Sequence, residues 1–375
     1  WSEEGPLTRV AHHHARSAAR ESLTPTQRRE AQLAFLRHAA SQGVACVHEC
    51  AGPDISGEED LVELLTLAAD PKLPDIIGYW GELGAVEKGN ALGARGLAGD
   101  LFVDGAVGSR TAALWTPYAD DPSTSGVLYL DADAIAEHLV DCTRSGIQAG
   151  FHVIGDAGVA EVTEGFRRAA KTLGEAALAS MRHRLEHLEM VDTDQAAELG
   201  RFGVVASVQP AFDSTWGGPS DMYVRRLGGH RGVRLNPLSD LAANGVLLAF
   251  GSDAPVTPVD PWGSIRAAVH HQTEGHAISP RAAFTAHTRA GWRAAGMDDG
   301  LVGTLTPGAP ATYAVWDAGE LVRSVPDSRV QRWSTDPASG VPGLPDLSPG
   351  AMLPRCLRTV LRGKTLYSHE PDEEE

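Results

Sequence analysis

GVLLAFGSDAPVTPVDPW, residues 245–262, is the stretch that decides the fold. Its first half, Val246 to Phe250, is short, continuous and apolar, which is typical of a strand covered on both faces, and Gly251 and Pro255 end that strand. The strand delivers one carboxylate, Asp253, to its C-terminal end. Burying an acid there costs free energy unless a cation or hydrogen-bond donors meet it. The sequence therefore predicts a partner opposite Asp253.

Other apolar segments of strand length precede this one, and helical segments separate most of them. We predict strands at 44–49, 76–80, 101–103, 148–154, 184–190, 204–209 and 246–250. We predict helices at 12–20, 24–41, 61–69, 132–145, 159–173, 193–200, 237–243, 261–271 and 279–295. Strands that alternate with helices in this way favour a parallel sheet. The predicted series is one strand short of a closed (β/α)8 barrel.

The composition excludes several classes of protein. The chain has 375 residues, 42% of them hydrophobic, enough for an α/β barrel with a small appendage. Its formal net charge is −17 and it has no basic cluster, so we expect neither nucleic acid nor an anionic membrane as a partner. No apolar run approaches the roughly 20 residues of a membrane span. The four cysteines form no disulfide framework and no signal peptide is evident, so we expect a cytoplasmic protein.

The character of the sequence changes after Gly300, which predicts two domains. Residues 1–300 hold the alternating strands and helices. Residues 301–375 contain strand-like segments at 304–317 and 357–368, joined by a linker rich in proline and glycine at 325–354. We expect these segments to form part of a small β lobe, and we expect the acidic tail, 370–375, to be disordered.

Three of the predicted strands end in residues that bind metals: His152, His187 and Asp253. They are spaced by about one and two βα units, so their side chains can converge on one rim of a barrel, where barrel enzymes hold their active sites. Each residue taken singly is more often structural. Together they indicate a metal site, because imidazole and carboxylate oxygen are the ligands that bind hydrolytic divalent metals.

Several stretches carry a resemblance to a known family, in that family's order along nearly the whole chain. They are VDGAVGSRTAAL (103–114), GFHVIGD (150–156), RLEH (184–187), SVQPAF (207–212), GSDAPVTPVDPW (251–262) and LTPGAPATYAVWD (305–317). The sequence resembles the amidohydrolase superfamily, in its YtcJ-like, N-substituted formamide deformylase-like branch. The resemblance implies a metal-dependent hydrolase with a distorted (β/α)8 TIM-type barrel and a β-sandwich lobe. It implies that His152 and His187 are metal ligands, and that Asp253 is both ligand and general base.

The sequence departs from the family pattern at the first strand. The family's first strand ends in a His-x-His pair, and no predicted strand here carries one. His12 and His14 match the His-x-His spacing, but a helical pattern follows them. We expect that the first strand lies upstream of Trp1, together with half of the β lobe, and that this piece alone has little activity.

A second departure lies on the fourth strand of the family. Where many relatives carry a carboxylated lysine that bridges two metals, this chain has Asp100. Strand alternation puts Asp100, Phe102 and Asp104 on one face. Asp100 could therefore ligate directly, or the site could hold one metal. We expect one or two divalent ions, with zinc as the first choice.

Other residues are candidates for substrate binding. Loop 105–111 could aim Ser109 or Arg110 at a substrate, although a plain tight turn explains it equally well. The aromatic residues at or beyond strand ends could line an apolar pocket or simply pack a loop; they are Trp80, Trp115, Phe212, Trp216 and Trp262. Cys46, His48 and Cys50 alternate on one strand face as a zinc site could, but core cysteines beside a histidine are the better interpretation.

These features predict a hydrolase of carbon–nitrogen bonds in amide-like, N-formyl or cyclic amide substrates. A divalent metal makes hydroxide available at neutral pH, and Asp253 would transfer the proton to the leaving amine. The alternative is a truncated or degenerate barrel that binds a small molecule or a partner subunit without hydrolysing anything. An incomplete barrel exposes two strand edges, which favours pairing with another chain, so a homodimer is also expected.

Overall fold

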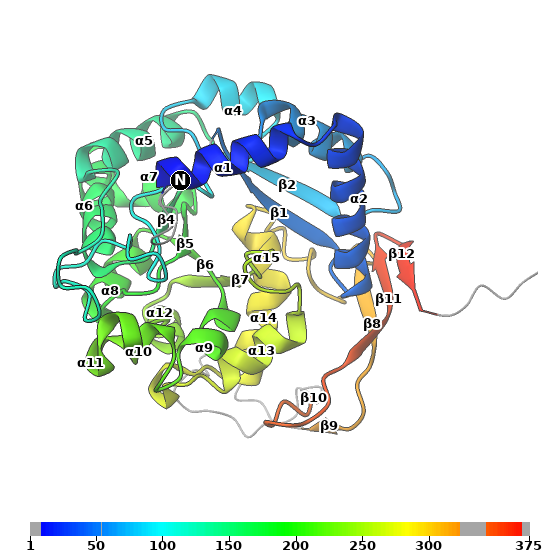
Figure 1. Cartoon of the computed structure of the whole chain (residues 1–375). Helices are drawn as coiled ribbons and strands as arrows, with labels where there is room; N and C mark the ends of the chain where they lie inside the picture. Colours follow the sequence, from blue (N-terminus) through cyan, green and yellow to red (C-terminus); the bar gives the residue numbers. More distant parts are fainter. Residues whose placement is uncertain (1–8, 54, 323–342, 370–375) are drawn as a thin grey trace, which may run out of the picture.

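One curled sheet of parallel strands forms the centre of the molecule, with helices around it (Figure 1). The computed structural model describes residues 9–53, 55–322 and 343–369. The seven strands pair in chain order, so β1 and β7 are the two edges of the sheet within the described residues. They are β1 (Cys46–Ala51), β2 (Asp75–Trp80), β3 (Gly96–Leu97), β4 (Gln148–Val153), β5 (Arg184–His187), β6 (Val205–Val208) and β7 (Leu247–Phe250). The curled parallel sheet confirms the predicted barrel-type fold class.

Helices precede, connect and follow the strands, and most of them cover the outside of the sheet (Figure 1). They are α1 (Arg9–Glu21), α2 (Pro25–Ser41), α3 (Glu58–Leu67), α4 (Val86–Leu92), α5 (Ala132–Arg144), α6 (Asp156–Leu173), α7 (Glu175–Ser180), α8 (Thr193–Arg201), α9 (Pro210–Trp216), α10 (Met222–Leu227), α11 (Gly229–Gly232), α12 (Leu238–Ala243), α13 (Pro261–Val269), the 3-10 turn η1 (Glu274–His276), α14 (Pro280–His287) and α15 (Arg289–Ala294). No helix in the described ranges is long and apolar enough to cross a membrane.

The start of α2 shows how local sequence sets a boundary. Thr24 caps the helix: its Oγ1 accepts from Gln27 N at 3.2 Å, and Gln27 Oε1 accepts from Thr24 N at 2.9 Å. This reciprocal capping box satisfies two N–H groups that the first turn cannot pair. His12 and His14 lie on α1, which confirms the helical interpretation of that stretch.

The third strand is the main correction to the predicted elements. It is Gly96–Leu97, whereas residues 101–103 form no strand and contribute only a single bridge between Phe102 and His152. A Cβ on Gly96 would lie 2.5 Å from Gln148 O, so only glycine lets β3 approach β4 this closely. Backbone hydrogen bonds still tie 101–103 to β4, with Val103 N donating to His152 O at 2.9 Å.

The core lies between the sheet and its helices. Every residue of β4, β5 and β6 is buried, as expected for parallel strands covered on both faces. Phe151 of β4 and Phe166 of α6 are fully buried, and each such side chain contributes roughly 1.5–3 kcal/mol. β5 ends at His187, earlier than predicted, because His187 and Leu188 have φ of 72° and 50° and leave the β region.

A small antiparallel lobe follows the barrel. Its sheet has the order β12 (Lys364–Ser368), β11 (Arg355–Leu361), β8 (Tyr313–Asp317), and a separate pair joins β9 (Leu321–Val322) to β10 (Leu344–Pro345). The lobe rests on α2, where Thr359 Oγ1 donates to Ala40 O at 2.6 Å (Figure 1). Part of the predicted linker, 325–342, and the acidic tail, 370–375, lie outside the described residues. The domain boundary at residue 300 stays a prediction.

Candidate metal and substrate site

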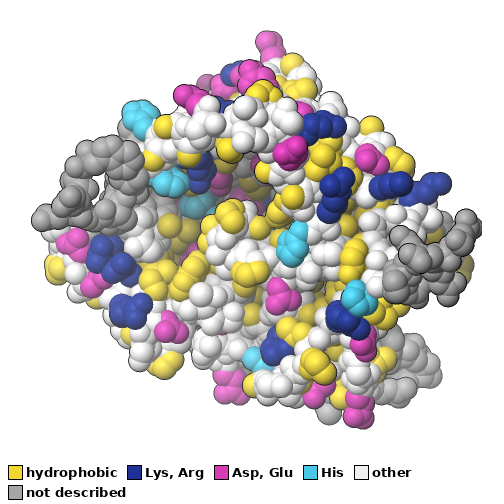
Figure 2. Space-filling view, turned by 45° about the vertical axis from the view of Figure 1, so that its right-hand side comes forward, with side chains coloured by type: hydrophobic (Ala, Val, Ile, Leu, Met, Phe, Trp, Pro, Cys, Tyr) yellow, Lys and Arg dark blue, Asp and Glu magenta, His cyan; other side chains and the backbone are white. Residues whose placement is uncertain are grey.

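A cavity of about 1850 Å³ opens inside the curled sheet. Figure 2 shows its mouth as a hollow in which histidine and acidic side chains lie below the surrounding surface. Its lining includes all the predicted site residues except Arg110 and Trp80: His152, His187, Asp253, Asp100, Ser109, Phe212 and Trp216. The fold therefore brings together side chains that are far apart in the sequence.

The two predicted histidine ligands are in direct contact. The rings of His152 and His187 have centroids 4.4 Å apart at an interplanar angle of 70°. His187 Nδ1 lies 2.8 Å from Gln209 Oε1, and Gln209 Nε2 donates to Ser207 O at 3.2 Å. Because the amide oxygen of Gln209 can only accept, Nδ1 of His187 donates to it, and in the neutral ring Nε2 is the nitrogen that keeps its lone pair. This is the tautomer in which a histidine can bind a metal through Nε2.

Negative charge surrounds this pair. Burial lowers the pKa of His187, but four nearby carboxylates raise it by more, so that the net pKa lies above the usual value of a histidine. These carboxylates belong to Asp253, Glu189, Glu186 and Asp100. Burial and the neighbouring Asp253 raise the pKa of Asp100 to about 7. The side chain of Asp253 is exposed toward the cavity. The protein groups that surround it still desolvate its carboxyl group and raise the pKa. The site therefore has the charge to attract a cation.

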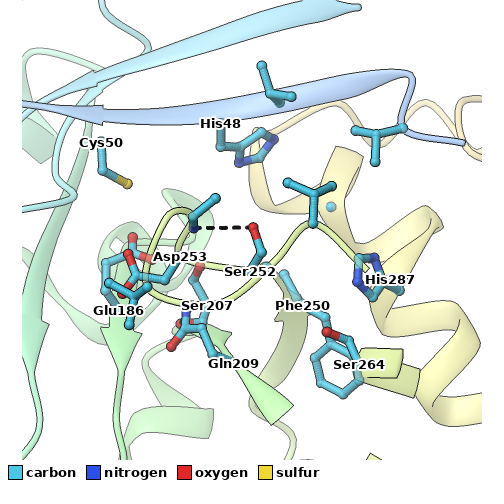
Figure 3. Close-up of a pocket in the computed structure, with 18 of the residues that line it drawn as sticks. His48, Cys50, Glu186, Ser207, Gln209, Phe250, Ser252, Asp253, Ser264 and His287 are labelled. Carbon is cyan, nitrogen blue, oxygen red and sulfur yellow. Dashed lines mark hydrogen bonds between the residues drawn. The ribbon is translucent and has the colours of Figure 1, made fainter. Parts of the chain in front are cut away.

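The backbone is strained at the residues expected to carry the chemistry. Asp253 has φ of 52° and His187 has φ of 72°, in the left-handed region that non-glycine residues seldom adopt. Such conformations persist where the surrounding structure fixes them, and they cluster at functional sites. Ala254 N donates to Ser252 Oγ at 3.3 Å and helps to shape the loop that carries Asp253 (Figure 3).

The side chains suit a divalent metal in kind and in charge, but they do not form a closed ligand set. Imidazole and carboxylate groups are typical zinc ligands. Within the described residues, no group of three or more His, Cys, Asp or Glu side chains is arranged to hold a metal ion. The assigned ligands His152, His187, Asp253 and Asp100 therefore stay predictions.

Two predicted substrate-binding residues lie elsewhere. Arg110 pairs with Asp120 at 3.1 and 3.0 Å and is not part of the cavity lining, because this ion pair holds it on the outside of its loop. Trp80 is 1% exposed in the core, where its Nε1 donates to Glu82 Oε2 at 2.7 Å. Neither residue therefore lines the cavity, and their substrate-binding roles stay predictions that this geometry does not support.

The other candidates divide between the cavity and the surface. Trp262 lines the cavity, whereas Trp115 is 67% exposed and lies outside the lining. Ser109 lines the cavity, but its Oγ is 2.7 Å from Thr111 Oγ1, which favours the tight-turn interpretation of the loop. The aromatic wall of the cavity thus comes mainly from Phe212, Trp216 and Trp262.

Sequence reasoning missed a buried ion pair that faces the cavity. Arg184 Nε donates to Glu186 Oε1 at 2.5 Å, and Arg184 Nη2 donates to Ser207 Oγ at 2.9 Å. Arg184 Nη1 lies 3.0 Å from His48 Nδ1, and the guanidinium stands 4.4 Å from the centre of the Tyr79 ring. The sequence RLEH (184–187) does contain a signal for this pair, because Arg184 and Glu186 occupy alternate positions of a strand and so share one face.

The same contacts bear on the cysteine-rich stretch of β1. Figure 3 shows His48 and Cys50 projecting from β1 into the cavity. Burial, and then Arg184, lowers the pKa of His48 to about 3, and burial raises the pKa of both Cys46 and Cys50. Since Arg184 occupies Nδ1 of His48, and no group of three His, Cys, Asp or Glu side chains in the described ranges is arranged to hold a metal ion, the structure favours core cysteines beside a histidine over a zinc site.

Comparisons with known proteins identify the family of the chain. The model of the Amidohydrolase family matches residues 1–367. The chain is 32% identical over 232 residues to Protein LONG AFTER FAR-RED 3 of Arabidopsis thaliana, covering 58% of this chain and 38% of that protein. It is 34% identical over 173 residues to YtcJ of Bacillus subtilis (strain 168), covering 45% of this chain and 30% of that protein.

A solved structure is similar over a larger share. It is an uncharacterized metal-dependent hydrolase from Pyrococcus furiosus, with 26% identity and a TM-score of 0.67, covering 83% of this chain and 65% of that chain. The matched part of this chain thus spans 38% and 30% of the two curated relatives.

Proposed function

Because this chain belongs to the amidohydrolase family, we propose that it acts as a metal-dependent hydrolase of carbon–nitrogen bonds in amide-like, N-formyl or cyclic amide substrates. The observation that carries the proposal is the contact between His152 and His187 in a cavity that also holds Asp253. The similarity to a metal-dependent hydrolase structure supports the same class of reaction.

Asp253 is the proposed general base. It lies on a loop that lines the cavity, and burial raises the pKa of its carboxyl group. A base whose pKa lies closer to neutrality can both take the proton of an attacking water and return it to the leaving nitrogen. A leaving amine departs poorly unless it is protonated, so one carboxylate performs both transfers.

The other cavity residues bind and orient. His152, His187, Asp253 and Asp100 are the proposed holders of a divalent ion, with zinc as the first choice, and such an ion supplies a water whose pKa is about 7. Gln209 fixes the ring of His187 through Nδ1. Phe212 and Trp216 offer an apolar wall to the substrate, with ring centroids 4.7 Å apart.

The test compares Asp253→Asn with the unchanged protein, both in the 375-residue chain and in the longest protein that contains it. A panel of N-formyl, linear and cyclic amides is assayed with added zinc. We expect turnover to fall by about 10²- to 10⁴-fold, because general base catalysis contributes that much. Asp192→Asn is the matched control, since Asp192 caps α8 and lies outside the cavity lining.

Turnover near the unchanged rate in Asp253→Asn would remove Asp253 from the mechanism. If none of the amides is hydrolysed by either protein with zinc present, while amides still bind, the cavity is a binding site without catalysis. The zinc content of both proteins, measured by elemental analysis, tests the proposed ion separately from turnover.

A further inference from the structure

Helices α10 and α11 lie at the rim of the molecule, away from the strands (Figure 1). Among the described helices and strands, they pack chiefly on each other. Yet α10 contributes Met222 and Tyr223 to the lining of the cavity. The segment leaves α9 through Gly217 and Gly218. One side of the cavity wall is thus carried by a segment that the elements of the barrel hold only loosely.

The loop that contacts α10 is fixed to the barrel. Asp104 Oδ2, at the base of this loop, accepts from Ala113 N at 2.9 Å and from Gly155 N at 2.7 Å. Val127 N donates to Thr111 O at 3.2 Å and closes the loop on itself. Residues 105–109 of the loop also line the cavity. The loop is therefore a firm part of the wall, against which α10 can be held.

Asp120 joins this loop to α10 through two arginines. Its carboxylate accepts from Arg110 Nε at 3.1 Å and Nη2 at 3.0 Å, and also from Arg226 Nη1 of α10. Arg226 Nε donates to Gly108 O at 3.3 Å. The three charged side chains are only 25% to 26% exposed, so solvent screens them less than it screens a fully exposed pair. Burial raises the pKa of Asp120, but the hydrogen bonds from Arg110 and Arg226 lower it by more, so the carboxylate stays charged.

Further contacts join the loop to α10 and α11. Ala119 N donates to Arg226 O at 2.8 Å, and the Arg231 side chain of α11 donates to Thr116 O and Pro117 O, each at 2.7 Å. The two segments also share an apolar cluster that is separate from the main core. It contains Val107, Ala112, Leu114, Tyr118, Ile154, Tyr223, Leu227 and Leu235. The loop and α10–α11 thus form one cap with its own small core.

We propose that Asp120 is a positioning residue for the cavity: through Arg226 it holds α10 against the loop, and so keeps Met222 and Tyr223 in the cavity wall. When this charged contact is released, α10–α11 moves away from the loop and one side of the cavity widens. Arg110, which does not line the cavity, acts by orienting Asp120. The role takes no part in the proposed reaction and does not depend on it.

Hydrogen–deuterium exchange, followed by mass spectrometry, measures how often α10–α11 opens, because the exchange of protected N–H groups follows the opening equilibrium. Asp120→Asn keeps the shape of the side chain and removes its charge. Exchange in residues 219–234 should become about fivefold faster, the effect of about 1 kcal/mol on an equilibrium, while exchange in β4, β5 and β6 should not change. Added salt screens the ion pair, so it should speed exchange in residues 219–234 of the unchanged chain and have little effect in Asp120→Asn.

Glu198→Gln is the matched control. Glu198 also accepts two hydrogen bonds from one arginine, Arg167, at 2.6 and 2.8 Å, and its side chain is 22% exposed. Neither residue lines the cavity, so this change should leave exchange in residues 219–234 as it was. Equal exchange in the unchanged chain and in Asp120→Asn overturns the proposal, and so does an equal acceleration in every peptide. If Asp120→Asn does not fold, Arg226→Gln removes the same contact from its other partner, and the same two results decide.

A disulfide can replace the ionic contact. A Cβ on Gly228 would lie 3.5 Å from the Cβ of Ala119, within the range that a disulfide requires. Ala119→Cys and Gly228→Cys are therefore added to Asp120→Asn, and a thiol titration checks that the oxidised form keeps the four native thiols, which are free. Exchange in residues 219–234 should return to that of the unchanged chain in the oxidised form and not in the reduced form. Fast exchange in the oxidised form would show that α10–α11 does not open from the loop at this contact.

Enzyme kinetics separate positioning from a merely structural role. For an amide that the chain hydrolyses, Asp120→Asn should raise KM about fivefold and leave kcat unchanged, because a wall that binds the ground state and the transition state alike affects only KM. A fall in kcat with an unchanged KM would contradict the proposal. Faster exchange in a chain that hydrolyses no amide keeps the positioning role of Asp120 and removes only the proposed function.

Discussion

Replacing Asp104 should destabilise the barrel more than most single changes. Asp104 is fully buried, and its carboxylate accepts three backbone N–H groups. Oδ1 accepts from Ile154 at 2.9 Å, and Oδ2 accepts from Ala113 at 2.9 Å and from Gly155 at 2.7 Å. The carboxylate thus joins a cavity loop to the turn between β4 and α6.

The magnitude follows from the number of donors that lose their acceptor. An unsatisfied buried donor costs about 1–3 kcal/mol. Asp104→Ala leaves three of them, and water entering the vacated volume relieves part of the cost, so we expect a loss of about 4 kcal/mol. Asp104→Asn keeps one acceptor oxygen but turns an NH2 group toward N–H donors, so we expect a loss of about 2–3 kcal/mol.

Urea unfolding followed by circular dichroism measures both variants. Asp156→Asn is the matched control, because Asp156 Oδ1 accepts from Trp115 N and Ala157 N nearby but the side chain is only half-buried. We expect that control to lose less than about 1 kcal/mol, as is usual for partly exposed polar groups. A loss below about 1 kcal/mol in Asp104→Ala would refute the reasoning, because three buried donors would then have found equivalent partners.

Two further predictions concern packing and pH. Gly43→Ala should lower the melting temperature and shift the fluorescence of Trp316, because a Cβ at Gly43 would lie 2.2 Å from the Trp316 ring. Gly146→Ala separates this clash from backbone strain, because Gly146 also follows a helix with positive φ but has nothing within 4 Å of a Cβ. Burial lowers the pKa of His183 to about 3, so the folded chain keeps this ring neutral while the unfolded chain protonates it below pH 6.5. The stability that depends on this neutral ring is present above pH 6.5 and falls by about 2 kcal/mol by pH 4.5. His183→Gln should therefore flatten the plot of the free energy of unfolding against pH. His230→Gln, at an exposed position, is the control and should leave that plot unchanged.

The strands could be predicted because burial leaves a strong pattern. Segments such as Val205–Val208 are apolar throughout, since both faces of a parallel strand are covered. β3 could not be found in the same way, because it has two residues and one of them is Gly96. What selects Gly96 is the closeness of Gln148 in the neighbouring strand, and that contact is invisible in the local sequence.

The candidate site was predictable to the extent that its residues end strands. His152, His187 and Asp253 were expected at one rim, and all three line the cavity. Tyr223 could not be found, because α10 follows a long connection after β6 and no pattern tells which of its side chains turns inward. Arg110 and Trp80 do not line the cavity, because Asp120 and Glu82 bind their polar atoms and the local sequence does not show which way those side chains turn.

The sequence predicted a buried Asp253 with a partner, whereas the structure exposes the side chain toward the cavity and supplies only part of a partner. Desolvation by the surrounding protein raises the pKa of Asp253, His187 lowers it, and Glu186 raises it. Asp100, Glu189 and Glu186 act on the same histidine. Arg184 pairs with Glu186, and Arg16 and His187 lower the pKa values of Asp100 and Asp253, yet both pKa values stay raised. The remaining negative charge is relieved either by protons, as the raised pKa values indicate, or by a bound cation. Protons neutralise each carboxylate separately, whereas a divalent ion would interact with several at once and would also satisfy the lone pair on His187 Nε2. The excess of negative charge beside a histidine with a fixed tautomer is therefore the physical basis for proposing a divalent ion at this place.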